Sequence, residues 1–330
     1  MKTIRWGIIG VGDVAEVKSG PAFYKAEHSQ LVAVMRRNGD KARDFAERHH
    51  VPRWYDDAEA LIQDAEVDAV YIATPPHMHK EYTLKAAAAG KPVYCEKPMA
   101  RSFDECQAMI AACQQADVPL WVAYYRRAMP RFLKIKELVD SKAIGEIRAV
   151  SIRLYRKADI QANTPASELP WRVIPEMAGG GIFVDLASHQ IDFLDYVLGP
   201  VEKVQGWATN QEHLYPAEDT VSAAFQFQSG VLGSGLWCFC AGHDLDEIVL
   251  IGTQGTITFT TFDTTPILVM NNQGSHTLDI GYPQHVHQPL VETIIAELNG
   301  EGYSPSTGES GARANWFIDK VLKSYREKKG

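Results

Sequence analysis

Short apolar runs alternate with helical patterns through the first part of this 330-residue chain. Each run is typical of a buried strand. The runs occupy residues 4–9, 31–35, 67–73, 93–95 and 120–123. Helical segments between them are long enough to carry the chain back across a sheet, so neighbouring strands are expected to be parallel. We therefore predict an α/β fold for residues 1–123, with a doubly wound parallel sheet.

The pattern changes after residue 123. Between residues 201 and 278 strand patterns follow one another, and Ser229-Gly230 and Gln254-Gly255 are typical of tight turns between antiparallel neighbours. We predict that residues 124–330 form an α+β domain with a large, mostly antiparallel sheet, for substrate binding and oligomerisation. The last helix is expected to pack back on the first domain.

Charge and sheet architecture indicate which partners the chain can have. Its formal net charge of -8 at pH 7 disfavours nucleic acid and membrane surfaces, because their binders present basic fields to phosphate. We expect a small-molecule substrate instead. A large sheet with helices on one side leaves its other face to be covered, so we also predict a homodimer or homotetramer through the C-terminal sheet.

Cysteine and histidine spacing disfavours disulfides and metals. The five cysteines form an odd set without paired C-x-x-C spacing. His77 with His79 and His285 with His287 lack further ligands at metal spacing, so no metal site is predicted. The N-terminus has no export signal, and no apolar run is long enough to cross a bilayer. We therefore expect a cytoplasmic protein.

The motif Gly10-x-Gly12-x-x-Ala15 follows the first strand and begins a helix, the position of a dinucleotide fingerprint. Gly10 permits a tight turn, Gly12 lets a pyrophosphate approach the backbone, and Ala15 allows close helix packing. Asp13 and Val14, at the same helix start, are included in the predicted cofactor contact.

The end of the second strand indicates which cofactor is bound. An NAD-binding chain usually offers Asp or Glu to the ribose there, whereas this chain has Arg36 and Arg37. Arginine can pair with a 2′-phosphate or stack on adenine. We favour NADP(H) as cofactor, with NAD(H) as the alternative, since both arginines can also be solvated at a strand end.

Glu96-Lys97-Pro98 follows directly after the strand at residues 93–95. Open α/β sheets bind ligands at the carboxyl ends of their strands. Lys97 can hydrogen-bond a substrate oxygen there, although on a solvated loop it would be an ordinary surface charge. Glu96 is a candidate contact for the cofactor ribose or for Lys97 itself.

A second polar group lies after the glycine run at residues 179–181. Asp185, His189 and Asp192 are spaced i, i+4, i+7, so they project from one face of a helix. The glycines are expected to let the first turn of this helix lie close against a flat ligand. A carboxylate near a helix start is electrostatically favoured, and histidine titrates near neutrality, which together indicate an acid-base site.

Taken together, these motifs and Thr74-Pro75 with His79 resemble the glucose-fructose oxidoreductase, inositol dehydrogenase and rhizopine catabolism (Gfo/Idh/MocA) family. The resemblance covers essentially the whole chain. It implies an N-terminal Rossmann domain, a C-terminal sheet domain, and hydride transfer between a nicotinamide and a sugar, polyol or related carbonyl compound. The family's catalytic residues fall on Lys97, Asp185 and His189, and its cofactor contacts include Thr74, Pro75 and His79.

Further positions match this family's pattern. Trp171-Arg172 resembles an element near the nicotinamide or substrate, and Tyr125 and Arg127 belong to a segment that lines the substrate pocket. Pro76 and Ala187 depart from common family residues at backbone-contact positions, where a change affects fine geometry and specificity more than chemistry. Two alternatives stay open: an NAD-dependent glycoside hydrolase on the same scaffold, and a nucleotide-binding protein without catalysis.

Overall fold

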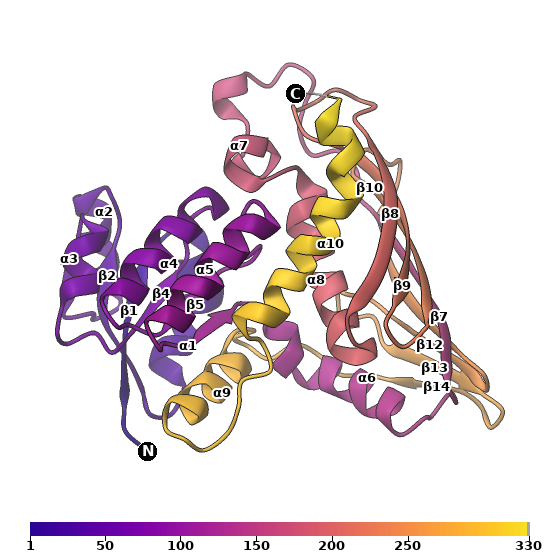
Figure 1. The fold of residues 1–330 in the computed structure, drawn as a ribbon, viewed down its shortest axis with the longest axis horizontal. Coiled ribbons are helices and arrows are strands. Elements are labelled where there is room, and N and C mark those ends of the chain that lie inside the picture. Colours follow the sequence, from indigo (N-terminus) through magenta and orange to yellow (C-terminus); the bar gives the residue numbers. More distant parts are fainter. Residues whose placement is uncertain (329–330) are drawn as a thin grey trace. The chain divides into compact units, whose positions relative to one another are not determined.

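The computed structural model describes residues 1–328, which divide into two compact units (Figure 1). The first unit joins Met1–Met129 to Pro283–Ala312, and the second joins Pro130–Tyr282 to the residues from Arg313 onward. The sequence-based boundary lay after residue 123 and left everything beyond it in the second domain. In the structure, residues 283–312 instead belong to the first unit.

Within the described residues, the first unit holds a six-stranded sheet in which the strand pairs are parallel. Its order is β3 (Arg53–Tyr55), β2 (Ser29–Met35), β1 (Ile4–Ile9), β4 (Ala69–Ile72), β5 (Val93–Cys95) and β6 (Leu120–Val122). The strand order changes direction between β1 and β4, the point where such sheets bind ligands. The predicted doubly wound sheet is confirmed.

Helices cover both faces of this sheet. They are α1 (Gly20–Lys25), α2 (Gly39–Arg48), α3 (Ala58–Gln63), α4 (His79–Ala88), α5 (Phe103–Gln115) and α9 (Gln288–Leu298). Three of them begin at side-chain caps: Asn38 accepts from the amide of Lys41, Asp57 from that of Ala60, and Ser102 from that of Glu105. Helices on both faces bury β4, β5 and β6 completely, which explains their continuous apolar runs.

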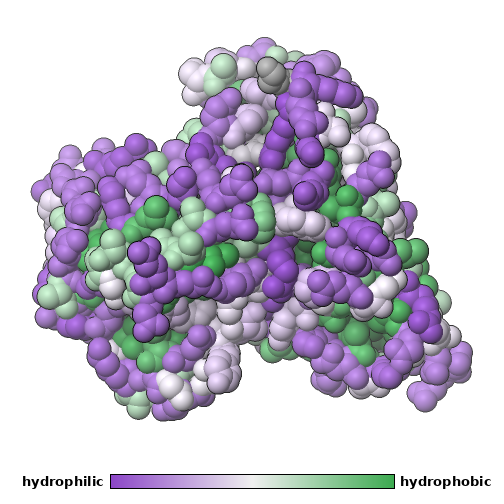
Figure 2. Space-filling model, in the orientation of Figure 1, coloured by the Kyte–Doolittle hydropathy of each residue, from purple (hydrophilic) through white to green (hydrophobic). Residues whose placement is uncertain are grey.

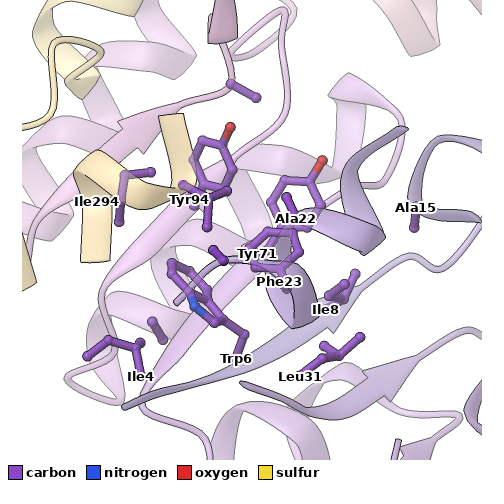
Figure 3. Close-up of a cluster of buried hydrophobic side chains, with 14 of the residues drawn as sticks. Ile4, Trp6, Ile8, Ala15, Ala22, Phe23, Leu31, Tyr71, Tyr94 and Ile294 are labelled. Carbon is purple, nitrogen blue, oxygen red and sulfur yellow. The ribbon is translucent and has the colours of Figure 1, made fainter. Parts of the chain in front are cut away.

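A cluster of buried apolar side chains fixes α9 to the first unit (Figure 3). Ile4, Trp6 and Ile8 alternate along β1, so they project from one face of the sheet. Phe23 of α1 and Ile294 of α9 pack against them. Because burial of each large apolar side chain contributes roughly 1.5–3 kcal/mol, this cluster accounts for the return of residues 283–312 to the first unit.

The second unit, as far as the structure describes it, contains an eight-stranded sheet that is antiparallel except for one parallel pair, β7 with β10. Its order is β14 (Gly274–Leu278), β13 (Ile267–Asn271), β12 (Gly255–Phe259), β11 (Leu245–Gly252), β7 (Ile147–Tyr155), β10 (Leu232–Cys238), β9 (Thr220–Phe227) and β8 (Val201–Thr209). The predicted large, mostly antiparallel sheet is confirmed.

Two long helices lie along one face of this sheet (Figure 1). Phe183 of α8 (Ile182–Leu198) packs edge-on against Trp237 of β10, and Phe317 of α10 (Gly308–Glu327) against Phe225 of β9. The remaining helices of this unit are α6 (Pro130–Asp140) and the short α7 (Pro175–Ala178). Phe225 and Trp237 alternate with exposed residues along their strands, so the two faces of the sheet differ in burial.

Hydrophilic residues cover most of the surface visible in Figure 2, and hydrophobic residues gather in smaller areas between them. Across residues 1–328, none of the helices combines the length and the apolar character that a membrane span requires.

Candidate active site

The glycine turn lies at the carboxyl ends of β1 and β2. Gly10 has a φ of +100°, which side chains rarely adopt, and a Cβ there would lie 2.9 Å from Cγ2 of Thr74. The Gly10 amide donates to the carbonyl of Met35 at 2.9 Å. Gly12 differs, since no heavy atom of the described chain lies within 4 Å of the Cβ it would carry. The turn is therefore closed toward β4 and open on the side of Gly12.

A helix of unusual shape follows the turn. Asp13 and Val14 begin it, Ala15–Ser19 form a π-helical turn, and α1 continues from Gly20. Asp13 is exposed and Val14 is half-buried. The first amides of such a helix lack intrahelical partners and can bind an anion, and π-helical turns are frequent at functional sites.

Positive charge lies beside this turn at the end of β2. Nη1 of Arg36 donates to the carbonyl oxygen of Val11 at 3.1 Å, so this arginine supports the turn itself. Arg37 is exposed, and Asn38 is occupied as the cap of α2. Residues 36–38 offer no carboxylate to a ribose, while Arg37 is available to a phosphate.

His79 connects the loops that follow β4 and β5. Its ring is fully buried, with Nε2 2.7 Å from the carbonyl oxygen of Thr74 and Nδ1 3.1 Å from that of Pro98. Burial lowers the pKa of His79. The hydroxyl of Thr74 is buried without a hydrogen-bond partner among the described residues, and Pro75 next to it is half-buried. The Thr74 loop thus presents an unsatisfied polar atom beside Gly10.

Lys97 follows β5 as predicted and is half-buried. Its peptide bond to Pro98 is cis. Glu96 is buried, and its carboxylate accepts from the amide of Lys97 at 3.0 Å and from the hydroxyl of Tyr71. Burial raises the pKa of Glu96, while the Tyr71 hydrogen bond and the charge of Lys97 act in the opposite direction.

Tyr125 and Arg127 belong to the first unit, in a 3-10 turn over Tyr125–Ala128. The ring of Tyr125 lies 4.5 Å from that of His287, centroid to centroid. Arg127 is buried, and its Nη1 donates to the carbonyl oxygen of Pro305 at 3.1 Å. The division into compact units therefore groups both residues with the glycine turn and Lys97 rather than with residues 130–282.

Two of the glycines before α8 have their Cβ sides against protein atoms, and the expectation that the helix start lies against a flat ligand stays a prediction. The Gly181 amide donates to Oε1 of the buried Glu218 at 2.7 Å. A Cβ on Gly181 would lie 2.7 Å from the Glu218 carbonyl oxygen, and one on Gly180 would lie 3.1 Å from Oε1. The small residues let the helix start approach Glu218, whose carboxylate also satisfies an orphan amide.

The polar residues of α8 differ in burial. Asp185, in the first turn, is half-buried, and its Oδ2 accepts from Nε of Arg172 at 3.2 Å. The Arg172 guanidinium in turn lies over the ring of Trp171, 4.4 Å from its centroid. His189 is only 4% exposed, and Asp192 is buried. The second unit thus brings together Trp171, Arg172 and Asp185, with His189 one helical turn further on.

Sequence reasoning missed two side chains beside Lys97. Tyr71 lies within an apolar strand, where an aromatic residue is normally core, and His287 was considered as a metal ligand or as the lead into a helix. The sequence feature that marks His287 is its position directly before α9, a helix with a proline in its first turn. Among residues 1–328, no group of three or more His, Cys, Asp or Glu side chains is arranged to hold a metal ion.

The strand order, the glycine turn and the lysine after β5 define the class of this protein: a dinucleotide-dependent oxidoreductase with a Rossmann unit and a second, antiparallel-sheet unit. The chain belongs to the GFO/IDH/MocA oxidoreductase family. Residues 4–124 match its NAD-binding Rossmann fold, and residues 132–258 match its C-terminal domain. The family resemblance read from the motifs is confirmed.

Individual relatives agree with this assignment. The chain is 43% identical over 318 residues to Oxidoreductase P35 of Formosa agariphila, covering 96% of this chain and 97% of that protein. It is 26% identical over 313 residues to 1,5-anhydro-D-fructose reductase of Ensifer adhaerens, covering 93% and 92%. An oxidoreductase structure from Agrobacterium radiobacter, in complex with NAD+, L-tartaric acid and magnesium, has the same fold, with a TM-score of 0.87 at 22% identity, covering 99% and 97%.

Proposed function

We propose that this oxidoreductase transfers a hydride between NADP(H) and a hydroxyl-bearing sugar, a polyol or the related carbonyl compound. The observation that carries the proposal is the placement of the open glycine turn, the Thr74 loop and Lys97 at the carboxyl ends of β1, β4 and β5 in one unit. The name of the Ensifer adhaerens relative, a reductase of an anhydro sugar, supports the substrate class.

The residues fit a dinucleotide. The open side of Gly12 and the unsatisfied hydroxyl of Thr74 leave space and a polar partner beside the turn. We propose that the cofactor is held by the following residues: Gly10, Gly12, Asp13, Val14, Arg36, Arg37, Thr74, Pro75, His79, Lys97, Trp171 and Arg172. NADP(H) is favoured over NAD(H) because Arg37 is exposed and no carboxylate stands at residues 36–38.

The proposed chemistry assigns one role to each of three residues. When bound, the nicotinamide accepts the hydride during oxidation and returns it during reduction. His189 accepts the substrate hydroxyl proton, and Asp185, paired with Arg172, orients the imidazole or a neighbouring hydroxyl. Lys97 donates a hydrogen bond to the same substrate oxygen and stabilises its developing negative charge. Tyr125 and Arg127 are proposed to line the substrate side.

A substrate screen tests this function. We expect NADP+ to be reduced in the presence of some member of a panel of aldoses, polyols and inositols, or NADPH to be oxidised by keto sugars. An NAD-dependent glycoside hydrolase would instead cleave an aryl glycoside without net change in cofactor absorbance. A protein that binds cofactor and acts on no member of either panel would contradict the proposal. The relatives described above are named oxidoreductases or reductases, which favours the first outcome.

We further propose a cytoplasmic homodimer or homotetramer assembled through the sheet of the second unit. The strand register places Trp207 and Leu236 opposite Ser222 on one face, and these apolar side chains are 61% and 39% exposed. Leu232 and Met270 are also exposed. An apolar sheet face of this kind is typical of an interface. The compartment is proposed because no disulfide joins the five cysteines, all within the described residues.

A further inference from the structure

A group of buried polar side chains lies beside Lys97 in the first unit. It consists of Tyr71 on β4, Tyr94 on β5, Glu96 after β5, and His287 before α9. Tyr71 and Tyr94 are fully buried, His287 is 1% exposed and Glu96 is 7% exposed. The two tyrosine rings stack 5.0 Å apart, and Figure 3 shows their hydroxyls leaving the apolar cluster on the same side. Burial of so many polar groups needs mutual hydrogen bonds.

These hydrogen bonds point toward the carboxylate of Glu96. The Tyr71 hydroxyl donates to Oε1, and the Lys97 amide donates to Oε2 at 3.0 Å. Nε2 of His287 lies 3.6 Å from the same Oε1. The Tyr94 hydroxyl is 3.3 Å from the other ring nitrogen, Nδ1. If Tyr94 donates to Nδ1, the neutral imidazole carries its proton on Nε2, facing Glu96.

The charges of the group agree with this direction of donation. Burial, followed by the charges of Lys97, Lys18 and Arg126, lowers the pKa of His287 to about 3, so the ring is neutral. Burial and the charge of Glu96 raise the pKa of Tyr71, which keeps it a phenol donor. The carboxylate of Glu96 is thus surrounded by neutral donors on one side and by Lys97 on the other.

We propose that Glu96 is a positioning residue for Lys97, and that Tyr71 and His287 hold it in place. One carboxylate oxygen accepts from the Lys97 amide and fixes the backbone there. Burial raises the pKa of Glu96, and the Tyr71 hydrogen bond, the Lys97 charge and the Lys97 amide oppose this, so the carboxylate charge is directed at Lys97. Both oxygens already contact protein groups, which favours this role over a contact with the cofactor ribose. The inference rests on the proposed role of Lys97 in hydride transfer.

The decisive measurement is the titration of Lys97 in the full-length enzyme. Lysine labelled with carbon-13 at the ε position reports its own protonation by NMR, and the Lys97 resonance is assigned by its loss in Lys97→Met. Removing a nearby anion favours the neutral amine, so the Lys97 resonance of Glu96→Gln should change at a lower pH than that of the wild type. Tyr71→Phe should shift the Lys97 titration in the same direction by a smaller amount. This variant replaces Glu96→Gln as the test if Glu96→Gln folds poorly.

Turnover across pH gives a second readout, with NADP+ and the best member of the polyol panel. Glu96→Gln should lose about tenfold in kcat and shift the pH profile, with the Kd for NADP+ unchanged. Asp68→Asn is the matched control, because Asp68 pairs with Arg5 just before β4, at the other end of that strand. It should move neither the Lys97 resonance nor the profile.

An unchanged Lys97 titration in both Glu96→Gln and Tyr71→Phe would overturn the inference, even if turnover fell. Failure of the proposed function has a different signature. If Lys97→Met kept full turnover, Lys97 would have no catalytic role, and the resonance alone would then decide whether Glu96 holds the lysine.

Discussion

At the scale of single residues, the environment of His287 determines its charge. The ring is almost completely buried, and its pKa of about 3 lies well below its ordinary value of 6.5. In the unfolded chain the ring takes up a proton as the pH falls below that ordinary value, whereas the folded protein resists protonation. A buried neutral histidine therefore contributes stability that is full above pH 6.5 and is lost as the pH falls toward 3.

We expect His287→Gln to remove part of this pH dependence. The fall in Tm between pH 7.5 and pH 5 should be smaller in the variant than in the wild type, because glutamine takes up no proton on unfolding. Calorimetry at the two pH values measures the difference. His276→Gln, on the exposed strand β14, is a suitable control and should change the slope little. A steeper fall in His287→Gln than in wild type would show that the ring is protonated when folded.

A second prediction at the residue scale concerns Arg37 and the choice between NADP(H) and NAD(H). If it binds the 2′-phosphate, Arg37→Ala should raise the KM for NADP+ by about tenfold or more and leave the KM for NAD+ nearly unchanged. Arg43→Ala, an exposed arginine on α2 paired with Asp40, should alter neither constant. A wild-type enzyme that strongly prefers NAD+ would refute the choice of NADP(H).

At the scale of elements, substitutions at the two glycines of the turn should affect folding and cofactor binding differently. Gly10 has a positive φ and touches Thr74, whereas Gly12 is open on the side of its missing Cβ. Gly10→Ala should therefore lower both Tm and cofactor affinity. Gly12→Ala should leave Tm within a few degrees of wild type while weakening cofactor binding at least tenfold, because its methyl group enters the space proposed for the pyrophosphate. Thermal melts and fluorescence titration with NADPH compare the two; equal binding by Gly12→Ala and wild type would contradict the site.

Elements with a continuous apolar run could be predicted from the sequence, whereas short elements without such a run could not. The runs that became β1, β2 and β5 carry enough apolar residues to be recognised. Strand β3 has three residues, none of them fully buried, and helix α3 has six, so neither shows a clear periodicity. The residues around Lys97 illustrate the same limit at the site. The motif identified Glu96, but its partners Tyr71 and His287 come from distant segments that only tertiary packing brings together.

At the scale of the whole molecule, the apolar face of the second unit predicts an assembly. Leu232 is 59% exposed on β10, aligned through Ala149 with Ile251 of β11 on the same face. A charge in the centre of an apolar interface has to be desolvated, so Leu232→Asp should convert the oligomer to a smaller species. Light scattering coupled to size-exclusion chromatography measures the mass. Lys41→Asp, at an exposed position of α2 in the first unit, is the control, and a monomeric wild-type enzyme at working concentration would contradict the proposal.

The central proposal is that Lys97 and His189 are both required for turnover. The direct test measures turnover and cofactor Kd in one preparation each of wild type, Lys97→Met and His189→Ala. Loss of acid-base help should lower kcat by about a hundredfold to ten-thousandfold in either variant, while cofactor still binds. Near-normal turnover in both variants, with cofactor bound, would contradict the claim.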